Sequence, residues 1–260
     1  MEWQLVPVVL VAAVAAHISV NTLNEYADFR SGLDLTTRRT PFSGGSGAIP
    51  ANPAALNAVL LTGLLCLAIT MGCGIYLATV RGWELIFAGV IGVALVLFYT
   101  PWINRLPLLC LIAPGLGFGV LMVVGSHWVL VGNITLQAIM ASLVPFMLVN
   151  NLLLLNQFPD VDADRAAGRR HILIVYGTYV GAGAYASAVV GCSLVVILGY
   201  VFNIWNTWAL LSILPLFVAV GISMVVLRNH AALGERNDVL GVNVAITLLT
   251  PLLLAVGIVL

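Results

Sequence analysis

The sequence predicts an all-α protein, a polytopic bundle in which about eight helices cross a membrane. Of its 260 residues, 62% are hydrophobic and only 8% are charged, whereas soluble domains carry about a quarter charged residues. Long apolar runs recur along the chain, and arginine falls almost entirely on one side of them. The net charge is zero, so no basic surface indicates nucleic acid as a partner.

Eight segments are long and apolar enough to be helices that cross a bilayer, which takes roughly 20 residues. They are residues 4–27, 54–80, 83–99, 106–125, 135–158, 172–203, 206–227 and 238–259. The third is short, and the sixth is long enough to tilt or to extend beyond the bilayer. Pro114, Pro145 and Pro215 are candidate kinks, which membrane helices tolerate. We expect residues 1–260 to form a single transmembrane domain.

Two connections are longer than the others, residues 28–53 and residues 159–171. When the eight helices alternate in direction, nine arginines share one side: Arg30, Arg38, Arg39, Arg105, Arg165, Arg169, Arg170, Arg228 and Arg236. Only Arg81 falls on the other side. The positive-inside rule makes the arginine side cytoplasmic and places both termini opposite. The absence of lysine is typical of a GC-rich microbial genome, so we expect a multi-pass protein of a prokaryotic cell membrane.

The acidic residues favour the same side and include two clusters led by asparagine. The clusters are Asn24, Asp28 and Asp34, and then Asn156, Asp160 and Asp164. Asparagine and aspartate four residues apart share a helix face, and this spacing occurs in both clusters. Each carboxylate at the centre of a membrane helix costs about 2.5–3.5 kcal/mol. Two such clusters repel one another unless positive charge lies between them.

These residue types favour magnesium and a diphosphate over an all-protein metal cage. Magnesium binds few protein oxygens and completes its shell with water and substrate phosphates. Arginines pair bidentately with phosphate oxygens, and the candidates near the clusters are Arg30, Arg38, Arg39, Arg169 and Arg170. The alternative interpretation is an interfacial fringe, in which the charged residues only terminate helices. Matching spacing on one side favours the binding site.

At these residues the sequence resembles the UbiA superfamily of intramembrane prenyltransferases. NEYADFRSGLD at 24–34 is similar to the first Asp-rich motif of that family, and NQFPDVDADRAAGRRH at 156–171 is similar to its second. FYTPW at 98–102 and GLGFGVLMVVGSHWVLVG at 115–132 most resemble the branch that prenylates dihydroxynaphthoate to make menaquinone precursors. The resemblance covers nearly the whole chain, and the paired motifs are its most specific part.

The resemblance implies nine transmembrane helices around a central cavity that opens laterally to lipid. It implies Mg2+ held between the two motifs and a polyprenyl diphosphate bound to it. The implied metal residues are Asn24, Asp28, Asp34, Asn156, Asp160 and Asp164. The expected diphosphate residues are Asn24, Asn156, Arg30, Arg39, Arg105, Arg169 and Arg170. We expect Asp28, Asp160, Asp164 and Tyr99 to be catalytic, although Tyr99 also fits an aromatic belt at the membrane interface.

The sequence departs from the family pattern at three points. Eight helices are predicted where the family has nine, and the missing one is the family's first. Glu25 stands where the first motif often has aspartate, which keeps the charge and lengthens its reach. The family's loop lysine that contacts diphosphate has no counterpart, and Arg105 is the nearest substitute.

The predicted activity is Mg-dependent transfer of a polyprenyl group from its diphosphate to an aromatic or quinone-precursor acceptor. The diphosphate would ionise towards an allylic carbocation, which the ring face of Tyr99 is placed to stabilise. A membrane terpene cyclase, which needs no acceptor, is an alternative within the same family. An ion-coupled transporter and a non-catalytic, lipid-binding relative are the alternatives from other classes. Membrane lipid is an expected partner in each case.

Overall fold

The computed structural model describes residues 1–260, and every regular element in it is a helix. Seven stretches are long and apolar enough to cross a membrane: Trp3–Ser31, Pro53–Arg81, Pro107–Val131, Leu136–Asn156, Thr178–Val201, Thr207–Arg228 and Asn237–Val259. A shorter apolar helix, α5 (Leu85–Phe98), makes the eighth. The prediction of a bundle of about eight helices with a short third member is therefore confirmed.

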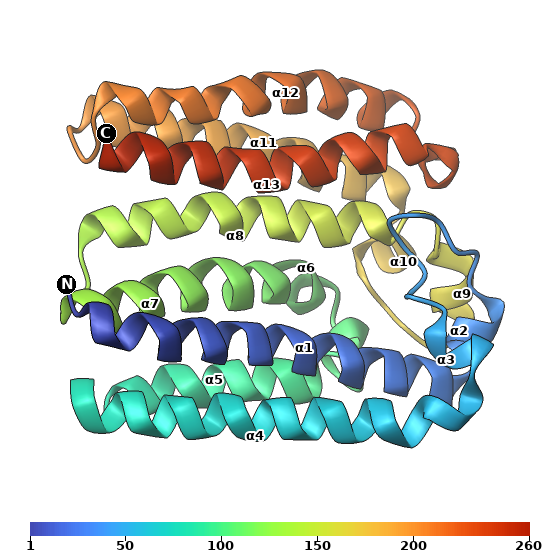
Figure 1. Ribbon diagram of the computed structural model, residues 1–260. Helices are drawn as coiled ribbons and strands as arrows, with labels where there is room; N and C mark the ends of the chain where they lie inside the picture. Colours follow the sequence, from blue (N-terminus) through green and yellow to red (C-terminus); the bar gives the residue numbers. More distant parts are fainter.

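The long helices run side by side, and the connections gather at the two ends (Figure 1). The long elements are α1 (Val6–Ser31), α4 (Leu56–Arg81), α6 (Pro107–Gly115), the π-helix η4 (Leu116–Leu121), α7 (Met122–Val131), α8 (Leu136–Asn156), α11 (Thr178–Val201), α12 (Ile213–Arg228) and α13 (Asn237–Val259). Both termini lie at one end, as the arginine distribution predicts, and α2 (Leu33–Thr36), α3 (Ala48–Ala51), α9 (Val161–Ala166) and α10 (Ile172–Tyr176) lie at the other. The remaining elements are the 3-10 turns η1 (Trp3–Leu5), η2 (Pro53–Ala55), η3 (Ile103–Arg105), η5 (Thr207–Ser212) and η6 (Leu233–Glu235).

Two predicted segments have different boundaries in the structure. Residues 172–203 do not form one long helix, because Gly177 takes a φ of +89° and separates α10 from α11. The segment predicted at 106–125 continues to Val131 and contains η4. Of the candidate kinks, Pro114 lies just before this π-helix and Pro215 lies where η5 passes into α12, while α8 continues through Pro145.

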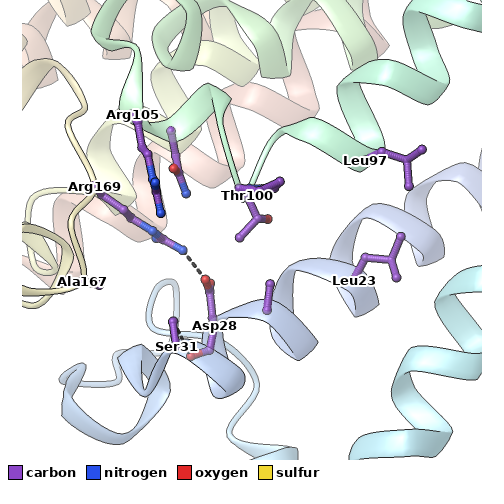
Figure 2. A pocket seen from close by; sticks show the side chains of 11 residues that line it. Leu23, Asp28, Ser31, Leu97, Thr100, Arg105, Ala167 and Arg169 are labelled. Atoms are coloured by element: carbon purple, nitrogen blue, oxygen red, sulfur yellow. Dashed lines mark hydrogen bonds and ion pairs between the residues drawn. The ribbon is translucent and has the colours of Figure 1, made fainter.

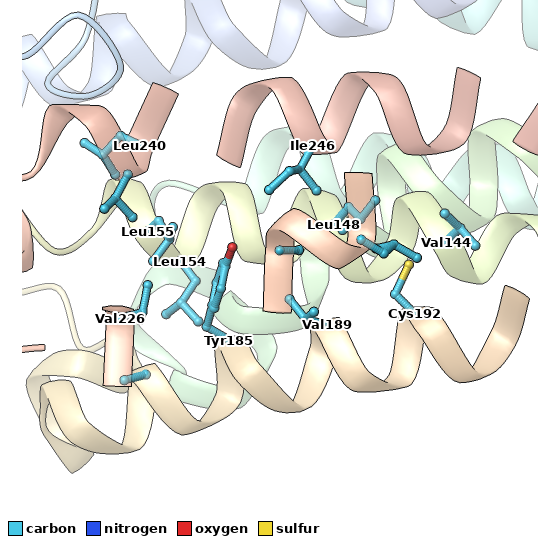
Figure 3. Close-up of a cluster of buried hydrophobic side chains, with 14 of the residues drawn as sticks. Val144, Leu148, Leu154, Leu155, Tyr185, Val189, Cys192, Val226, Leu240 and Ile246 are labelled. Atoms are coloured by element: carbon cyan, nitrogen blue, oxygen red, sulfur yellow. The ribbon is translucent and has the colours of Figure 1, made fainter. Parts of the chain in front are cut away.

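The largest buried cluster joins α8, α11, α12 and α13 (Figure 3). Tyr185, which is fully buried, donates its hydroxyl hydrogen to Asn243 Oδ1 at 2.9 Å. Asn151 Nδ2 donates to the Tyr185 carbonyl at 3.1 Å. Polar side chains of this kind hold membrane helices together, because lipid offers them no alternative partner. The four helices therefore form one packed half of the bundle.

The π-helix allows the α6–α7 stretch to approach α8 closely through two glycines. The Gly115 amide donates to Asn150 Oδ1 at 2.6 Å. A Cβ added at Gly115 would lie 2.1 Å from the Phe146 carbonyl oxygen, and one at Gly119 would lie 2.4 Å from the Phe146 nitrogen. Backbone atoms of α8 cannot yield by that much, so these two positions require glycine.

Alanine at Gly115 or Gly119 should therefore destabilise the bundle, by about 1–3 kcal/mol or more, as overpacked sites do. Gly125→Ala is the matched control, because nothing lies within 4 Å of the Cβ it would add and alanine is the better helix former. The melting temperature of the purified protein in detergent measures the effect. Equal melting temperatures for all three variants would contradict this account of the crossing.

Candidate active site

A cavity of about 330 Å³ opens at the end of the bundle that holds α2, α9 and α10 (Figure 2). Three separate parts of the chain line it: the last turns of α1, the end of α5 with the segment that follows, and the loop after α9. Its lining residues are Leu23, Ala27, Asp28, Ser31, Leu97, Thr100, Pro101, Asn104, Arg105, Ala167 and Arg169. The first Asp-rich motif and the end of the second thus meet at one cavity.

The first cluster is arranged by α1 itself. Asn24 and Asp28 lie one turn apart, and Asn24 Nδ2 donates to Asp28 Oδ2 at 3.0 Å. Thr100 Oγ1 donates to Asn24 Oδ1 at 2.7 Å, so the amide is held from both ends and the Asp28 side chain is held with it. The helix ends at Gly32, whose φ of +79° turns the chain. Asp34 consequently lies on α2, half-buried and separate from the Asn24–Asp28 face.

The second cluster does not continue one helix face, in contrast to the first. α8 ends at Asn156, a turn follows through Pro159, and Asp160 is the residue before α9. Asp164 then lies within α9 and is 2% exposed. The side-chain oxygen Oδ1 of Asp160 is buried and has no hydrogen-bond partner. The repeated four-residue spacing therefore spans a helix end and a turn in this part of the chain.

Arg169 joins the two clusters, and Figure 2 shows its pair with Asp28. Its Nη2 forms an ion pair with Asp28 Oδ1, and its Nη1 lies 2.9 Å from Asp164 Oδ1. The Arg169 amide also donates to the Asp164 carbonyl at 2.9 Å. His171 Nε2 lies 3.0 Å from the other oxygen of Asp164. The Arg169 guanidinium thus lies between the carboxylates of Asp28 and Asp164. The sequence predicts positive charge between the two clusters.

The charges around this bridge shift the pKa of neighbouring groups. Burial, together with the negative charge of Asp164, raises the pKa of Asp160 to about 7. Burial and the charges of Asp28 and Glu25 raise the pKa of Asp34 to about 6. Burial alone would lower the pKa of Arg169, but the charges of Asp164 and Asp28 outweigh burial and raise it above its ordinary value. A further cation near Asp160 or Asp34 would therefore stabilise the ionised form of its carboxylate.

The other predicted cations lie around the cavity at different distances from it. Arg105 lines the cavity beside Arg169 (Figure 2). The side chain of Arg170 is exposed, while its amide donates to the Asn104 carbonyl at 2.9 Å. Arg30, in the last turn of α1, and Arg39, after α2, are both exposed. The structure thus brings Arg105 and Arg169 to the cavity, whereas the other three are exposed and do not line it.

Tyr99 lies close to the site but does not line the cavity. Its hydroxyl oxygen is 4.0 Å from Cys110 Sγ, and Gln157 Nε2 is 3.5 Å from the same sulfur. Tyr99 therefore packs beneath the bridge between α5 and α6. Asn156 is half-buried at the end of α8.

The sequence did not predict a role for Asn104, a buried polar residue of the cavity. Asn104 is 6% exposed, it lines the cavity, and its Oδ1 has no hydrogen-bond partner. A single asparagine in a short link gives no periodic or spacing signal. Only its position beside Asp28 and Arg169 marks it as a polar group available to a ligand.

The segment from Gly32 to Gly47 is tied down over the end of the bundle. Glu25 accepts hydrogen bonds from the Ser46 amide at 3.0 Å and from the Ser46 hydroxyl at 2.9 Å. Phe42, near the middle of the segment, packs against the buried cluster of the second half. The connection between α1 and α4 therefore reaches across to the opposite half of the bundle.

The residues present fit magnesium that arrives with a diphosphate rather than a metal held by protein alone. No three acidic, histidine or cysteine side chains converge closely enough to hold an ion together. Magnesium commonly takes one or two carboxylates and completes its shell with substrate phosphates. The unpartnered oxygen of Asp160 and the carboxylates held by Arg169 are donors of the required hard type.

Comparison with known proteins identifies the family of the chain. A family model described as the UbiA prenyltransferase family matches residues 1–237. The chain is 28% identical over 164 residues to 1,4-dihydroxy-2-naphthoate octaprenyltransferase from Bacillus subtilis (strain 168). That alignment covers 62% of this chain and 51% of the relative, so the matched region spans about half the relative's length.

A solved structure has the same fold. The apo structure of a UbiA homologue from Aeropyrum pernix K1 superposes with a TM-score of 0.73 at 17% identity, covering 100% of this chain and 90% of that one. The family match extends over most of the chain and includes both Asp-rich motifs. On this match, the chain belongs to the UbiA prenyltransferase family.

Proposed function

We propose that this protein transfers a polyprenyl group from a polyprenyl diphosphate to an aromatic quinone precursor within the membrane, with Mg2+ as cofactor. The observation that supports this most strongly is that Arg169 pairs with both Asp28 and Asp164 beside a cavity that Asp28 and Arg169 line. Family membership supports the prenyl donor. The name of the Bacillus relative supports a dihydroxynaphthoate as the acceptor.

Residues of both motifs would hold the ion and the diphosphate. Asp28, Asp160 and Asp164 are the principal metal residues, with Asn24, Asn156 and Asp34 beside them. Bound magnesium supplies Lewis-acid neutralisation of the charge that develops on the leaving group. Arg169 and Arg105 donate hydrogen bonds to diphosphate oxygens. The exposed arginines attract the anion electrostatically; they are Arg30, Arg39 and Arg170.

The apolar part of the cavity controls what happens to the reacting carbon. The allylic carbon–oxygen bond breaks, its electron pair leaves with the diphosphate, and a ring carbon of the acceptor attacks the cationic carbon. A proton then leaves that ring carbon and aromaticity returns. Leu23, Ala27 and Leu97 line the cavity and keep water from the cation. Tyr99 does not line the cavity, so the cation-stabilising role predicted for its ring stays a prediction.

The surroundings of this proposed enzyme follow from the same distribution of charge. Residues 1–260 act as one transmembrane domain, with the arginine-rich end and the cavity towards the cytoplasm of a prokaryotic cell. Lipid covers the apolar outer faces of the helices, and the prenyl tail lies along an apolar wall. The charged diphosphate head group therefore lies at the aqueous end of the cavity, while the prenyl tail stays within the membrane.

The test is turnover of a radiolabelled polyprenyl diphosphate by purified protein in detergent, with 1,4-dihydroxy-2-naphthoate as acceptor. We expect prenylated product with Mg2+ and none after removal of metal with EDTA. Release of diphosphate without prenylated acceptor would contradict transfer and favour cyclisation. Failure to bind the prenyl diphosphate in the presence of Mg2+ would contradict the proposal as a whole.

A further inference from the structure

The polar face of α1 extends beyond the diphosphate site. His17, Asn21, Asn24 and Asp28 follow one another at intervals of four, three and four residues, so they lie on one face of the helix. At 1.5 Å per residue, His17 lies about 16 Å along the axis from Asp28. Both His17 and Asn21 fall within the membrane-spanning stretch Trp3–Ser31. Polar side chains at such depth are costly, and they mark functional sites by default.

This face points towards the parts of the bundle that build the active site. The opposite face of α1 packs on α4, where Ser19 Oγ donates to the Gly63 carbonyl at 2.9 Å. The polar face instead contacts Arg169 through Asp28 and Thr100 through Asn24. Deeper in the membrane, the His17 ring meets the Phe118 ring of η4 edge-on, with centroids 5.2 Å apart. The His17 side chain therefore faces η4, and Asn21 shares this face of α1.

Hydrogen-bonding groups on these two residues are left for a ligand. Both side chains are exposed in the structure. Asn21 Nδ2 donates to the His17 carbonyl at 2.8 Å, which leaves its Oδ1 without a protein partner. The imidazole nitrogens of His17 form no hydrogen bond within the protein. The ring packs edge-on against the Phe118 ring. One turn further along this face stands Val14, which is apolar, so the polar patch ends at His17.

We propose that His17 and Asn21 bind the polar substituents of the aromatic acceptor, an inference that rests on the prenyl transfer proposed above. The acceptor ring must come within about 3–3.5 Å of the allylic carbon, which is attached to the diphosphate held at Asp28. Asn21 lies about 10 Å deeper than Asp28 along the helix axis. A ring held beside Asn21 and His17 can therefore present its far edge to that carbon.

The chemistry of the patch distinguishes the acceptor from the prenyl tail. An isoprenoid chain has no group that can pair with an imidazole or an amide. A hydroxyl can donate to Asn21 Oδ1, and a carboxylate or hydroxyl oxygen can accept from the His17 ring. The patch thus fits an aromatic acid or phenol, and its edge-on Phe118 partner adds an apolar surface for the ring.

The experiment compares His17→Leu and Asn21→Leu with the wild-type protein. Leucine is favourable in membrane helices, so both variants should fold, and Val14→Leu on the same face is the matched control. Equilibrium binding of radiolabelled 1,4-dihydroxy-2-naphthoate and of a prenyl diphosphate with Mg2+ is measured separately, and KM is measured for each substrate. We expect both leucine variants to weaken acceptor binding and to raise its KM about tenfold or more. Diphosphate binding should stay within about twofold.

The conservative variant His17→Gln keeps a hydrogen-bond donor and should retain most of the acceptor affinity. Unchanged acceptor binding in both leucine variants would overturn the proposal. Weakened diphosphate binding with unchanged acceptor binding would also overturn it, in favour of contact with the prenyl chain. Wild-type protein that binds the diphosphate but no acceptor overturns this proposal alone, whereas binding of neither substrate overturns the proposed function together with it.

Discussion

Alanine in place of Asp28 or Asp160 is expected to abolish prenyl transfer while the helix bundle stays folded. Asp28 is 7% exposed and pairs with Arg169, and Asp160 has a buried oxygen without a partner. Both are placed to receive a cation, and Asp28→Ala still leaves Arg169 paired with Asp164, so the bundle should remain folded. Loss of one preorganised electrostatic group costs about 100- to 1,000-fold in kcat. Initial rates with saturating prenyl diphosphate and acceptor measure the effect.

The second motif contains its own control for this prediction. Asp162 lies between Asp160 and Asp164 in sequence, but its side chain is 96% exposed and pairs only with Arg165 on the surface. Asp162→Ala should therefore keep activity within about twofold, because exposed ion pairs contribute little. Full activity in both Asp28→Ala and Asp160→Ala would show that the site has been assigned to the wrong residues.

Leucine in place of Arg169 is expected to destabilise the metal-free protein strongly. The side chains of Arg169, Asp28 and Asp164 are 20%, 10% and 3% exposed, so removal of the guanidinium leaves two buried carboxylates facing each other. Removal of one partner from a buried ion pair costs about 3–5 kcal/mol. The melting temperature in detergent with EDTA should fall by several degrees, as an effect of this size implies.

The ligand should reverse part of this loss. Mg2+ with inorganic diphosphate brings positive charge to the same carboxylates, so it should raise the melting temperature of Arg169→Leu by more than that of the wild type. Arg170→Leu is the matched control, because its side chain is exposed and only its amide contacts Asn104. If Arg169→Leu and Arg170→Leu melt at the same temperature in EDTA, the bridge does not stabilise the fold.

The helices could be predicted because apolar length alone specifies them. All eight predicted segments are helical, including the short α5. Two boundaries were wrong for local reasons that hydrophobicity does not report. Gly177 breaks the sixth segment through a positive φ, and the π-helix after Pro114 belongs to a stretch that continues to Val131. Backbone conformation at single residues is decided by packing and steric freedom, which a count of apolar residues does not contain.

The residues of the candidate site could be predicted from the sequence more fully than the contacts between them. Spacing placed Asn24 and Asp28 on one face, and charge bias placed Asp164 at the same end of the bundle. The specific role of Arg169 required the fold, because it pairs with a residue 141 positions away. Arg169 and Arg170 are adjacent in the sequence, and no sequence pattern indicates which of them pairs with the carboxylates. The turn at Gly168, with a φ of +79°, directs the chain so that Arg169 faces the carboxylates and Arg170 does not.

The bridge made by Arg169 also has a consequence for how substrate enters. The two carboxylates already hold an internal counter-ion, so an incoming metal–diphosphate must compete with it. In the proposed enzyme, Asp28 and Asp164 would hold the metal, and the guanidinium of Arg169 would donate to the phosphate oxygens. Asp164 is bonded to both the side chain and the amide of Arg169, which couples this competition to the loop after α9. The magnesium concentration that the proposed enzyme needs would then depend on how strongly the Arg169 guanidinium binds Asp28 and Asp164.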